Sequence, residues 1–390
     1  MLMRTKMNII YKGKRTGTIN EIRKILRTPR KAESLVFDLA KMPRETAGGL
    51  LFVCGDVGEE NAALYKAKAG EIGADFIFAG SDTWSSTLKA IRKVFDPSRH
   101  QGILLMGSAS ELPSTPIAHK GSSSYTDWFM QDVDGDGVPD VPIGRIFGPP
   151  KTILYHMDPM IIDSNIAVVF DSQPGRSNRH VQALAKLGFD VEVLEKFTPQ
   201  DMKLMSVCEF ILQFSDGVYT SRIHGTPEMW ASHNSMILSY EQAAQINFEG
   251  YPFIYSEACC TAREGPLLKA FLNQGACYLG ATMDTMNNIR PFDDWRDCAY
   301  CDGYKFGLLD LLHSYNRLGQ VKLQVDRELL EHLDPNAQRE IEGVSKGQSS
   351  DIVSENALSV IEWVFYGNPM RGTTVGPNAD YTPGKLIVDT

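Results

Sequence analysis

Residues 251–282 read YPFIYSEACCTAREGPLLKAFLNQGACYLGAT, and this stretch indicates the fold more clearly than any other part of the chain. It opens with a short apolar run at 252–256, which is typical of a buried strand. An amphipathic helical segment follows at 266–272, and a second apolar run lies at 276–280. Two apolar runs joined through a helix form a βα unit, so we expect neighbouring parallel strands here.

The same alternation of apolar runs and helical segments begins at Gly49 and covers most of the chain. We predict strands at residues 50–54, 75–79, 102–106, 165–170, 190–194, 210–214, 252–256 and 276–280. We predict helices at residues 61–72, 86–94, 179–187 and 266–272. Right-handed crossovers place helices on both faces of such a sheet. The expected fold is therefore an α/β/α sandwich with a mainly parallel sheet.

The composition divides the chain and limits its partners. A segment rich in Pro, Gly, Ser and Asp at 113–163 separates two βα blocks. We expect an N-terminal extension at 1–47, a first α/β subdomain at 48–150, a second at 160–325, and a helical and irregular tail at 326–390. The formal net charge is −9, and the chain has no block rich in Lys and Arg apart from the scattered basic residues between Arg4 and Lys31. Because such a charge repels phosphate, we expect no nucleic-acid partner.

The cysteines and the apolar segments indicate the cellular compartment of the chain. Seven cysteines are an odd number, and two of them are adjacent, which argues against a disulfide framework. No stretch reaches the length of a membrane span. The first eleven residues contain no apolar core of a signal peptide, so we expect the chain as written to be cytoplasmic.

A cysteine and a histidine form the candidate catalytic pair. Cys259 follows the run 252–256, and open α/β sheets bind their ligands at the carboxyl ends of the strands. The strand at 210–214 leads towards His224, whose imidazole could activate a thiol and protonate a leaving amine. The N–H groups of Gly225 and Cys259 could stabilise an oxyanion. Only one of Cys259 and Cys260 can face the histidine, because adjacent side chains at a strand end point in opposite directions.

The stretch 251–282 resembles the gingipain-type cysteine peptidases of the caspase-like clan. In that family an apolar strand ends in Ala-Cys, a helix follows, and a Gly-Ala strand closes the unit, as at Ala258-Cys259, 267–272 and 275–282 here. Other stretches match in the family's order: ILLMG at 103–107 with Leu112-Pro113, DVDGDGVPD at 132–140 with IGR at 143–145, His224-Gly225 with Trp230, and FYGNP at 365–369. The resemblance spans roughly residues 48–370.

The resemblance implies a fold, an activity and a set of site residues. It implies a caspase-like α/β/α sandwich and a cysteine endopeptidase that hydrolyses a protein or peptide substrate. Cys259 is the nucleophile in the family's register and His224 its acid/base partner, with no cofactor needed for the chemistry. The family often works as a dyad, and Asp216 or Glu228 could orient the imidazole. Relatives of this type are often exported.

An acidic loop offers a possible metal site. Asp132, Asp134 and Asp136 alternate with other residues in a glycine-rich loop, and Asp140 follows. Alternating carboxylates of this kind often bind calcium. Position twelve of an EF-hand would fall on Ile143, so the bidentate glutamate of that motif is missing. A structural calcium ion and a solvated acidic turn both stay open.

Two other functions compete with the peptidase. The first is a catalytically inactive gingipain-like binding or scaffold protein. It is favoured by Ala262, where the family commonly has glycine, and by the eight residues, 216–223, before the histidine. The second is a nucleotide-binding α/β protein, since this architecture hosts many functions. The chain has no G-x-G-x-x-G and no P-loop after its first predicted strand, which argues against the second.

Overall fold

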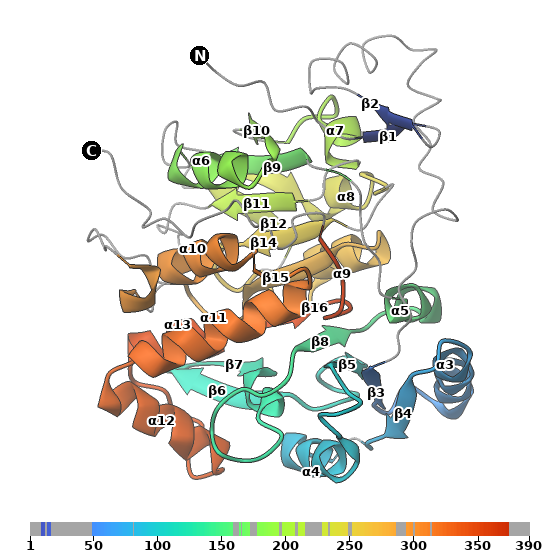
Figure 1. Cartoon of the computed structure of the whole chain (residues 1–390), viewed down its shortest axis with the longest axis vertical. Coiled ribbons are helices and arrows are strands. Elements are labelled where there is room, and N and C mark those ends of the chain that lie inside the picture. The colour runs from blue at the N-terminus through green and yellow to red at the C-terminus, as the bar shows by residue number, and fades with distance from the viewer. Residues whose placement is uncertain are drawn as a thin grey trace.

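The computed structural model describes residues 9–11, 14–16, 49–80, 82–158, 164, 166–171, 178–194, 197–206, 210–214, 228–232, 235–248, 252–285, 294–298, 301–312 and 314–373. At the centre of this described part lies one sheet of ten strands with helices on both faces (Figure 1). The strand order is β10 (Asp190–Leu194), β9 (Ile166–Asp171), β11 (Phe210–Phe214), β14 (Phe253–Ser256), β15 (Cys277–Ala281), β16 (Trp363–Tyr366), β8 (Ile143–Ile146), β5 (Gly102–Met106), β3 (Leu50–Cys54) and β4 (Asp75–Phe78).

The two βα blocks join in this sheet and run in opposite directions. Strand β16 pairs antiparallel with β15 on one side and parallel with β8 on the other. All other neighbours in the ten-stranded sheet are parallel. Strands β9, β10, β11, β14 and β15 therefore end at one edge of the sheet, while β3, β4, β5, β8 and β16 end at the opposite edge.

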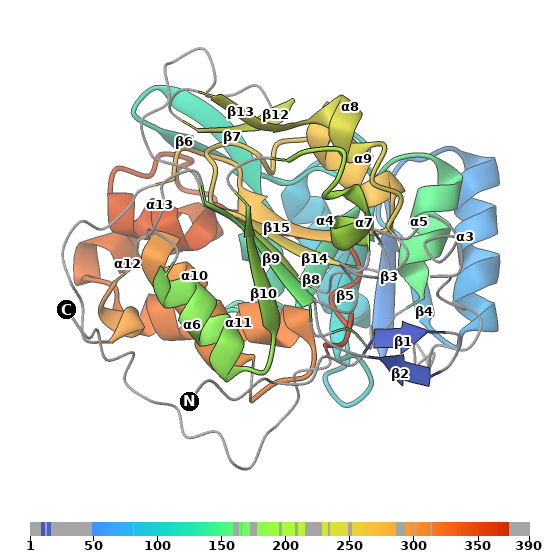
Figure 2. The same cartoon turned by 90° about the horizontal axis from the view of Figure 1, so that it is seen from above.

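Successive side chains of a strand point to opposite faces of the sheet. Both faces carry apolar side chains, and a layer of helices covers each of them. In β3, Phe52 joins the core on one face, whereas Val53 joins a core on the other. The first layer contains α3 (Glu59–Glu71), α5 (Pro150–Met157), α7 (Met202–Ser206), α8 (Tyr240–Ala243) and α9 (Pro266–Asn273). The second contains α4 (Trp84–Val94), α6 (Asn178–Lys186), α10 (Cys301–Leu311), α11 (Leu318–His332), α12 (Pro335–Ser345) and α13 (Glu355–Ile361) (Figure 2). The predicted α/β/α sandwich with a mainly parallel sheet is confirmed.

Smaller elements lie outside the central sheet. They are the 3-10 helices η2 (Trp128–Gln131) and η3 (Trp295–Asp297), and three hairpins: β1 (Ile9–Tyr11) with β2 (Lys14–Thr16), β6 (Thr115–His119) with β7 (Ser122–Thr126), and β12 (Met229–Ser232) with β13 (Ser235–Ser239). Within the described residues, no helix is long and apolar enough to cross a lipid bilayer.

Two strands of the central sheet, β8 and β16, were not predicted as strands. Strand β8 contains Gly144 and Arg145, which weaken its apolar pattern. A Cβ atom at position 144 would lie only 2.2 Å from the carbonyl oxygen of Gly367, so glycine is needed where these backbones approach. Strand β16 lies in the segment 326–390, which was expected to be helical and irregular, and it contributes the strand between the two blocks.

A buried ion pair secures β8. Arg145 is fully buried and binds Asp127 through two hydrogen bonds, Nε to Oδ2 at 2.7 Å and Nη2 to Oδ1 at 2.8 Å. Its Nη1 donates to the carbonyl oxygens of Gly107 and Leu112. The Ser114 hydroxyl donates to Asp127, so both charged groups are well satisfied. Burial opposes the charge on Arg145, but Asp127 outweighs burial, and the pKa of Arg145 lies above its usual value.

Candidate active site

Strand β14 carries Cys259 to an edge of the sheet. The strand is buried between β11 and β15 and ends at Ser256, three residues before Cys259. Cys260 then adopts a left-handed backbone conformation with φ 60°, which is uncommon for a residue other than glycine. Its N–H donates to the carbonyl oxygen of Met283, after β15, at 2.9 Å. Strained residues of this kind cluster at functional sites, so the turn marks this strand end as a candidate site.

Thr285 holds the sulfur of Cys259 in place. The thiol is buried, with 8% of the residue exposed. The backbone N–H of Thr285 donates to Sγ at 3.3 Å, and the Thr285 hydroxyl lies 3.4 Å from Sγ. That hydroxyl also donates to the carbonyl oxygen of Glu257 at 2.8 Å. A hydroxyl has a single proton, and that of Thr285 is used in the hydrogen bond to Glu257. The Cys259 thiol is therefore the donor in its contact with the Thr285 hydroxyl oxygen.

Burial keeps both neighbouring thiols protonated. Burial raises the pKa of Cys259 to about 11, although the hydrogen bond from the Thr285 N–H lowers it. Burial also raises the pKa of Cys260 to about 12, and its Sγ donates to Asp284 Oδ1 at 3.4 Å. A thiolate is the nucleophilic form of cysteine. Cys259 therefore needs a base or a cation beside it before it can attack a carbonyl group.

An ion pair lies beneath the turn. Glu257 and Lys305 are both buried, and Lys305 Nζ donates to Glu257 Oε2 at 2.5 Å. Lys305 belongs to α10 in the second helix layer. The ion pair therefore connects the second helix layer to Glu257, two positions before Cys259. No sequence pattern predicts this pair, because a lysine and a glutamate 48 residues apart share no local signal.

Glu362 is a second buried acidic residue that belongs to none of the predicted motifs. Its side chain is fully buried directly before β16, and neither carboxyl oxygen has a hydrogen-bond partner among the described residues. Burial, and then the charge of Asp284, raise the pKa of Glu362 well above its usual value. The Glu362 charge in turn contributes to the raised pKa of Cys259. The sequence feature that points to a buried acid is the single glutamate within the mostly apolar run 357–366.

The predicted partners of Cys259 lie mostly outside the described residues. These are His224, Gly225 and Asp216. Strand β11, which precedes them, is next to β14, with Gln213 opposite Ser256. It thus ends at Phe214 on the same edge of the sheet as Cys259. Glu228 is described and exposed directly before β12, where its carbonyl oxygen accepts the N–H of Tyr240.

The acidic loop brings three of its four predicted ligands together. One carboxylate oxygen from each of Asp132, Asp134 and Asp136 lies within 4.8 Å of the others. Asp132 is buried, and burial raises its pKa although the N–H groups of Gly135 and Gly137 and the charge of Arg92 lower it. Asp140 instead accepts the backbone N–H groups of residues 133 and 134. Carboxylate oxygens in this number and spacing suit a hard cation such as calcium.

Comparison with solved structures identifies a protein of the same fold. No family model matches the chain, and no curated protein matches it. A solved structure named "Structure of Protease" matches with a TM-score of 0.55 and 14% identity, over 84% of this chain and 79% of that chain. The two proteins share a fold. At this identity the likeness shows the fold alone.

A second solved structure gives no support for a common fold. It is a putative branched-chain amino acid ABC transporter from Silicibacter pomeroyi, with 11% identity over 62% of this chain and 68% of that chain. Its TM-score is 0.18, which is too low for a shared architecture.

Proposed function

We propose that the protein is a gingipain-like cysteine endopeptidase of the caspase-like clan, with Cys259 as nucleophile and His224 as acid/base. The observation that carries the proposal is the position of Cys259. It follows the buried central strand β14 on a strained turn, at the edge where α/β sheets bind ligands. The fold shared with a protease supports the same assignment.

The proposed reaction has two steps. His224 accepts the proton of the Cys259 thiol, and the thiolate attacks the carbonyl carbon of a peptide bond. The N–H groups of Gly225 and Cys259 stabilise the oxyanion, the C–N bond breaks, and His224 protonates the leaving amine. Water, deprotonated by His224, then hydrolyses the thioester and releases the acid and the free thiol. Asp216 or Glu228 would orient the imidazole, and the chemistry needs no cofactor.

The reactivity of Cys259 tests this assignment through its dependence on pH. Without a base, a thiol with a pKa of about 11 should react with iodoacetamide about tenfold faster for each pH unit between about 7 and 10. We expect this steep profile in His224→Ala. The wild type should react much faster at neutral pH and depend less on pH. Tandem mass spectrometry, which locates the label on Cys259 or on the adjacent Cys260, measures the rate in each protein.

The same experiment separates the peptidase from its main rival. If wild type and His224→Ala show the same steep profile, His224 does not activate the thiol. Cys259 would then be an inert buried cysteine, whose raised pKa keeps it protonated at neutral pH. The chain would be an inactive gingipain-like binding or scaffold protein. Cys260, whose thiol is also buried, serves as the internal reference within the same digest.

We also propose that the loop of Asp132, Asp134 and Asp136 binds a structural calcium ion. A cation would neutralise three clustered carboxylates, one of which is buried. At a hundredfold excess over Kd, calcium should stabilise the fold by about 2.7 kcal/mol. Thermal unfolding in calcium chloride and in EDTA should show this as a higher Tm with calcium.

Variants of the loop provide the control for calcium. Asp134 and Asp136 are exposed, so the double variant Asp134→Asn/Asp136→Asn should fold but lose the response to calcium. Asp351 is exposed and lies outside the loop, and Asp351→Asn should keep the response. Equal Tm values of the wild type in calcium and in EDTA would favour the solvated acidic turn.

A further inference from the structure

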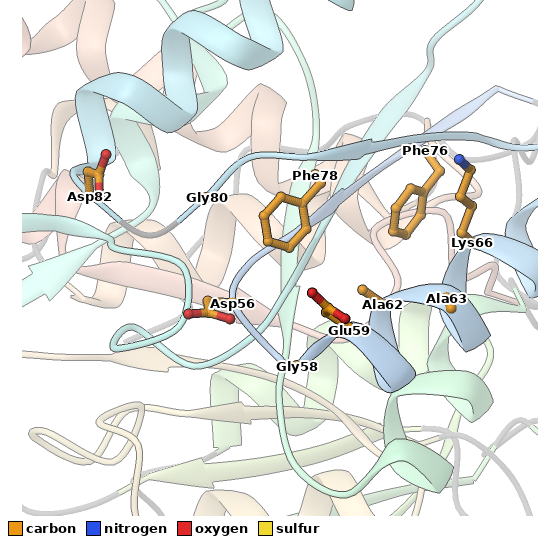
Figure 3. A pocket seen from close by; sticks show the side chains of 10 residues that line it. All are labelled: Asp56, Gly58, Glu59, Ala62, Ala63, Lys66, Phe76, Phe78, Gly80 and Asp82. Carbon is orange, nitrogen blue, oxygen red and sulfur yellow. The ribbon is translucent and has the colours of Figure 1, made fainter.

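A cavity of about 710 Å³ lies on the first βα block, away from Cys259. Figure 3 shows its two walls, with the rings of Phe76 and Phe78 from β4 facing Ala62 and Ala63 of α3. Phe76 and Phe78 share a face of the strand because side chains alternate along it. The two alanines are small, which leaves the space between strand and helix open.

Among the described residues, Phe78 has no packing role that explains its size. It is 58% exposed, and it is among the few large apolar side chains of the described structure that are exposed. The residue before it, Ile77, packs on the other face of β4 against a hydrophobic core. The Phe78 ring therefore offers exposed apolar surface in the wall of the cavity, against which a bound group can pack.

The rim of the cavity is acidic. Asp56 follows β3, Glu59 begins α3, and Asp82 follows β4, and all three are exposed. Lys66 is the one basic residue that lines the cavity within the described part of the chain. Three carboxylates and one ammonium leave a net charge of −2, which favours a cationic ligand. A phenyl ring adds to this preference, because a cation is attracted to its face.

We infer that this cavity is a docking site for an arginine- or lysine-bearing segment of a polypeptide. The aliphatic stem of such a side chain fits against Phe76 and Phe78, and its charged end reaches the carboxylates of the rim. Small-molecule sites enclose most of their ligand. With more than half of Phe78 exposed, this cavity leaves part of a bound group open to solvent. A side chain carried by a longer chain suits such an open site.

The site is independent of the proposed peptidase chemistry. Six strand spacings separate β4 from β14 in the sheet order, which corresponds to about 29 Å. The two sites also lie at opposite edges, because β4 and β14 run in opposite directions. Binding at the cavity can therefore be measured whether or not Cys259 is catalytic.

Fluorescence anisotropy of a labelled peptide tests the inference. The probe is a fluorescein-labelled hexapeptide of alternating arginine and leucine, titrated with the full chain carrying Cys259→Ala, so that the peptide stays intact. We expect saturable binding that weakens with salt. Phe78→Ala and the double variant Asp56→Asn/Asp82→Asn should each raise Kd about fivefold or more. A peptide with glutamate in place of arginine should not bind.

Matched controls and competing outcomes complete the test. Glu71→Gln changes an exposed acid of α3 outside the cavity, and Val353→Ala changes an exposed apolar residue elsewhere, and both should leave Kd unchanged. Phe78→Ala should keep the wild-type Tm, because its side chain is mostly exposed. An unchanged Kd in Phe78→Ala, or no saturable binding, would overturn the docking site. If free agmatine binds as tightly as the peptide, the ligand is a small cation and the polypeptide assignment is wrong.

Discussion

Cys259→Ala should reduce peptide hydrolysis by at least about a thousandfold, because the proposed reaction has no other nucleophile. Turnover of a peptide library that varies the residue before the cleaved bond measures the loss and gives the specificity of the wild type. The alanine side chain is smaller than cysteine and lies at the end of a buried strand, so the fold should persist. An unchanged Tm would show that the loss is chemical.

Cys260→Ala is the matched control for this substitution. It also removes a buried thiol, and it retains the backbone N–H that donates to Met283. We expect hydrolysis to continue in this variant, since the Cys260 thiol contacts Asp284 and its backbone only shapes the turn. Hydrolysis that survives Cys259→Ala and is lost in Cys260→Ala would contradict the choice of nucleophile. Turnover lost in neither variant would contradict the peptidase mechanism.

Arg145→Met should lower the free energy of unfolding by about 3–5 kcal/mol. The substitution leaves Asp127 as a buried carboxylate without its cation, and it removes donors from the carbonyl oxygens of Gly107 and Leu112. Breaking one side of a buried pair costs more than the pair itself contributes. Chemical denaturation followed by circular dichroism measures the change.

A double variant identifies the source of that loss. Arg145→Met/Asp127→Leu removes both charges, so no buried charge is left unpaired, and it should recover part of the stability. Lys346→Met is the control, because its ion pair with Glu342 on α12 is exposed and should contribute little. If Arg145→Met proved as mild as Lys346→Met, the ion pair would not be important for the fold.

Much of the sheet could be predicted because its strands are short, apolar and separated by amphipathic helices. The predicted strands at 50–54 and 210–214 coincide with β3 and β11. Their signal is local, since burial on both faces requires a continuous apolar run. Strand β8 lacks that run because Arg145 lies in its middle. Its place in the sheet depends on a carboxylate 18 positions away in the chain, which no local pattern reveals.

The candidate site was predictable only in part. The position of Cys259 after a buried strand follows from the apolar run and the general geometry of α/β sheets. The residues around Cys259 could not be predicted in this way, because Thr285 and Glu362 come from other segments and meet the turn only in the folded chain. The pairing of Cys259 with His224 stays a prediction, and so do the roles of Gly225 and Asp216.

The place of β16 in the sheet has a consequence for biosynthesis. Residues 363–366 form the strand that joins β15 to β8, although those two strands come much earlier in the chain. While the nascent chain leaves the ribosome, β15 and β8 each present an unpaired edge until this late segment arrives. Exposed edges of this kind recruit strands from other chains. Translation that stops before Trp363 should therefore yield an aggregation-prone product that depends on chaperones.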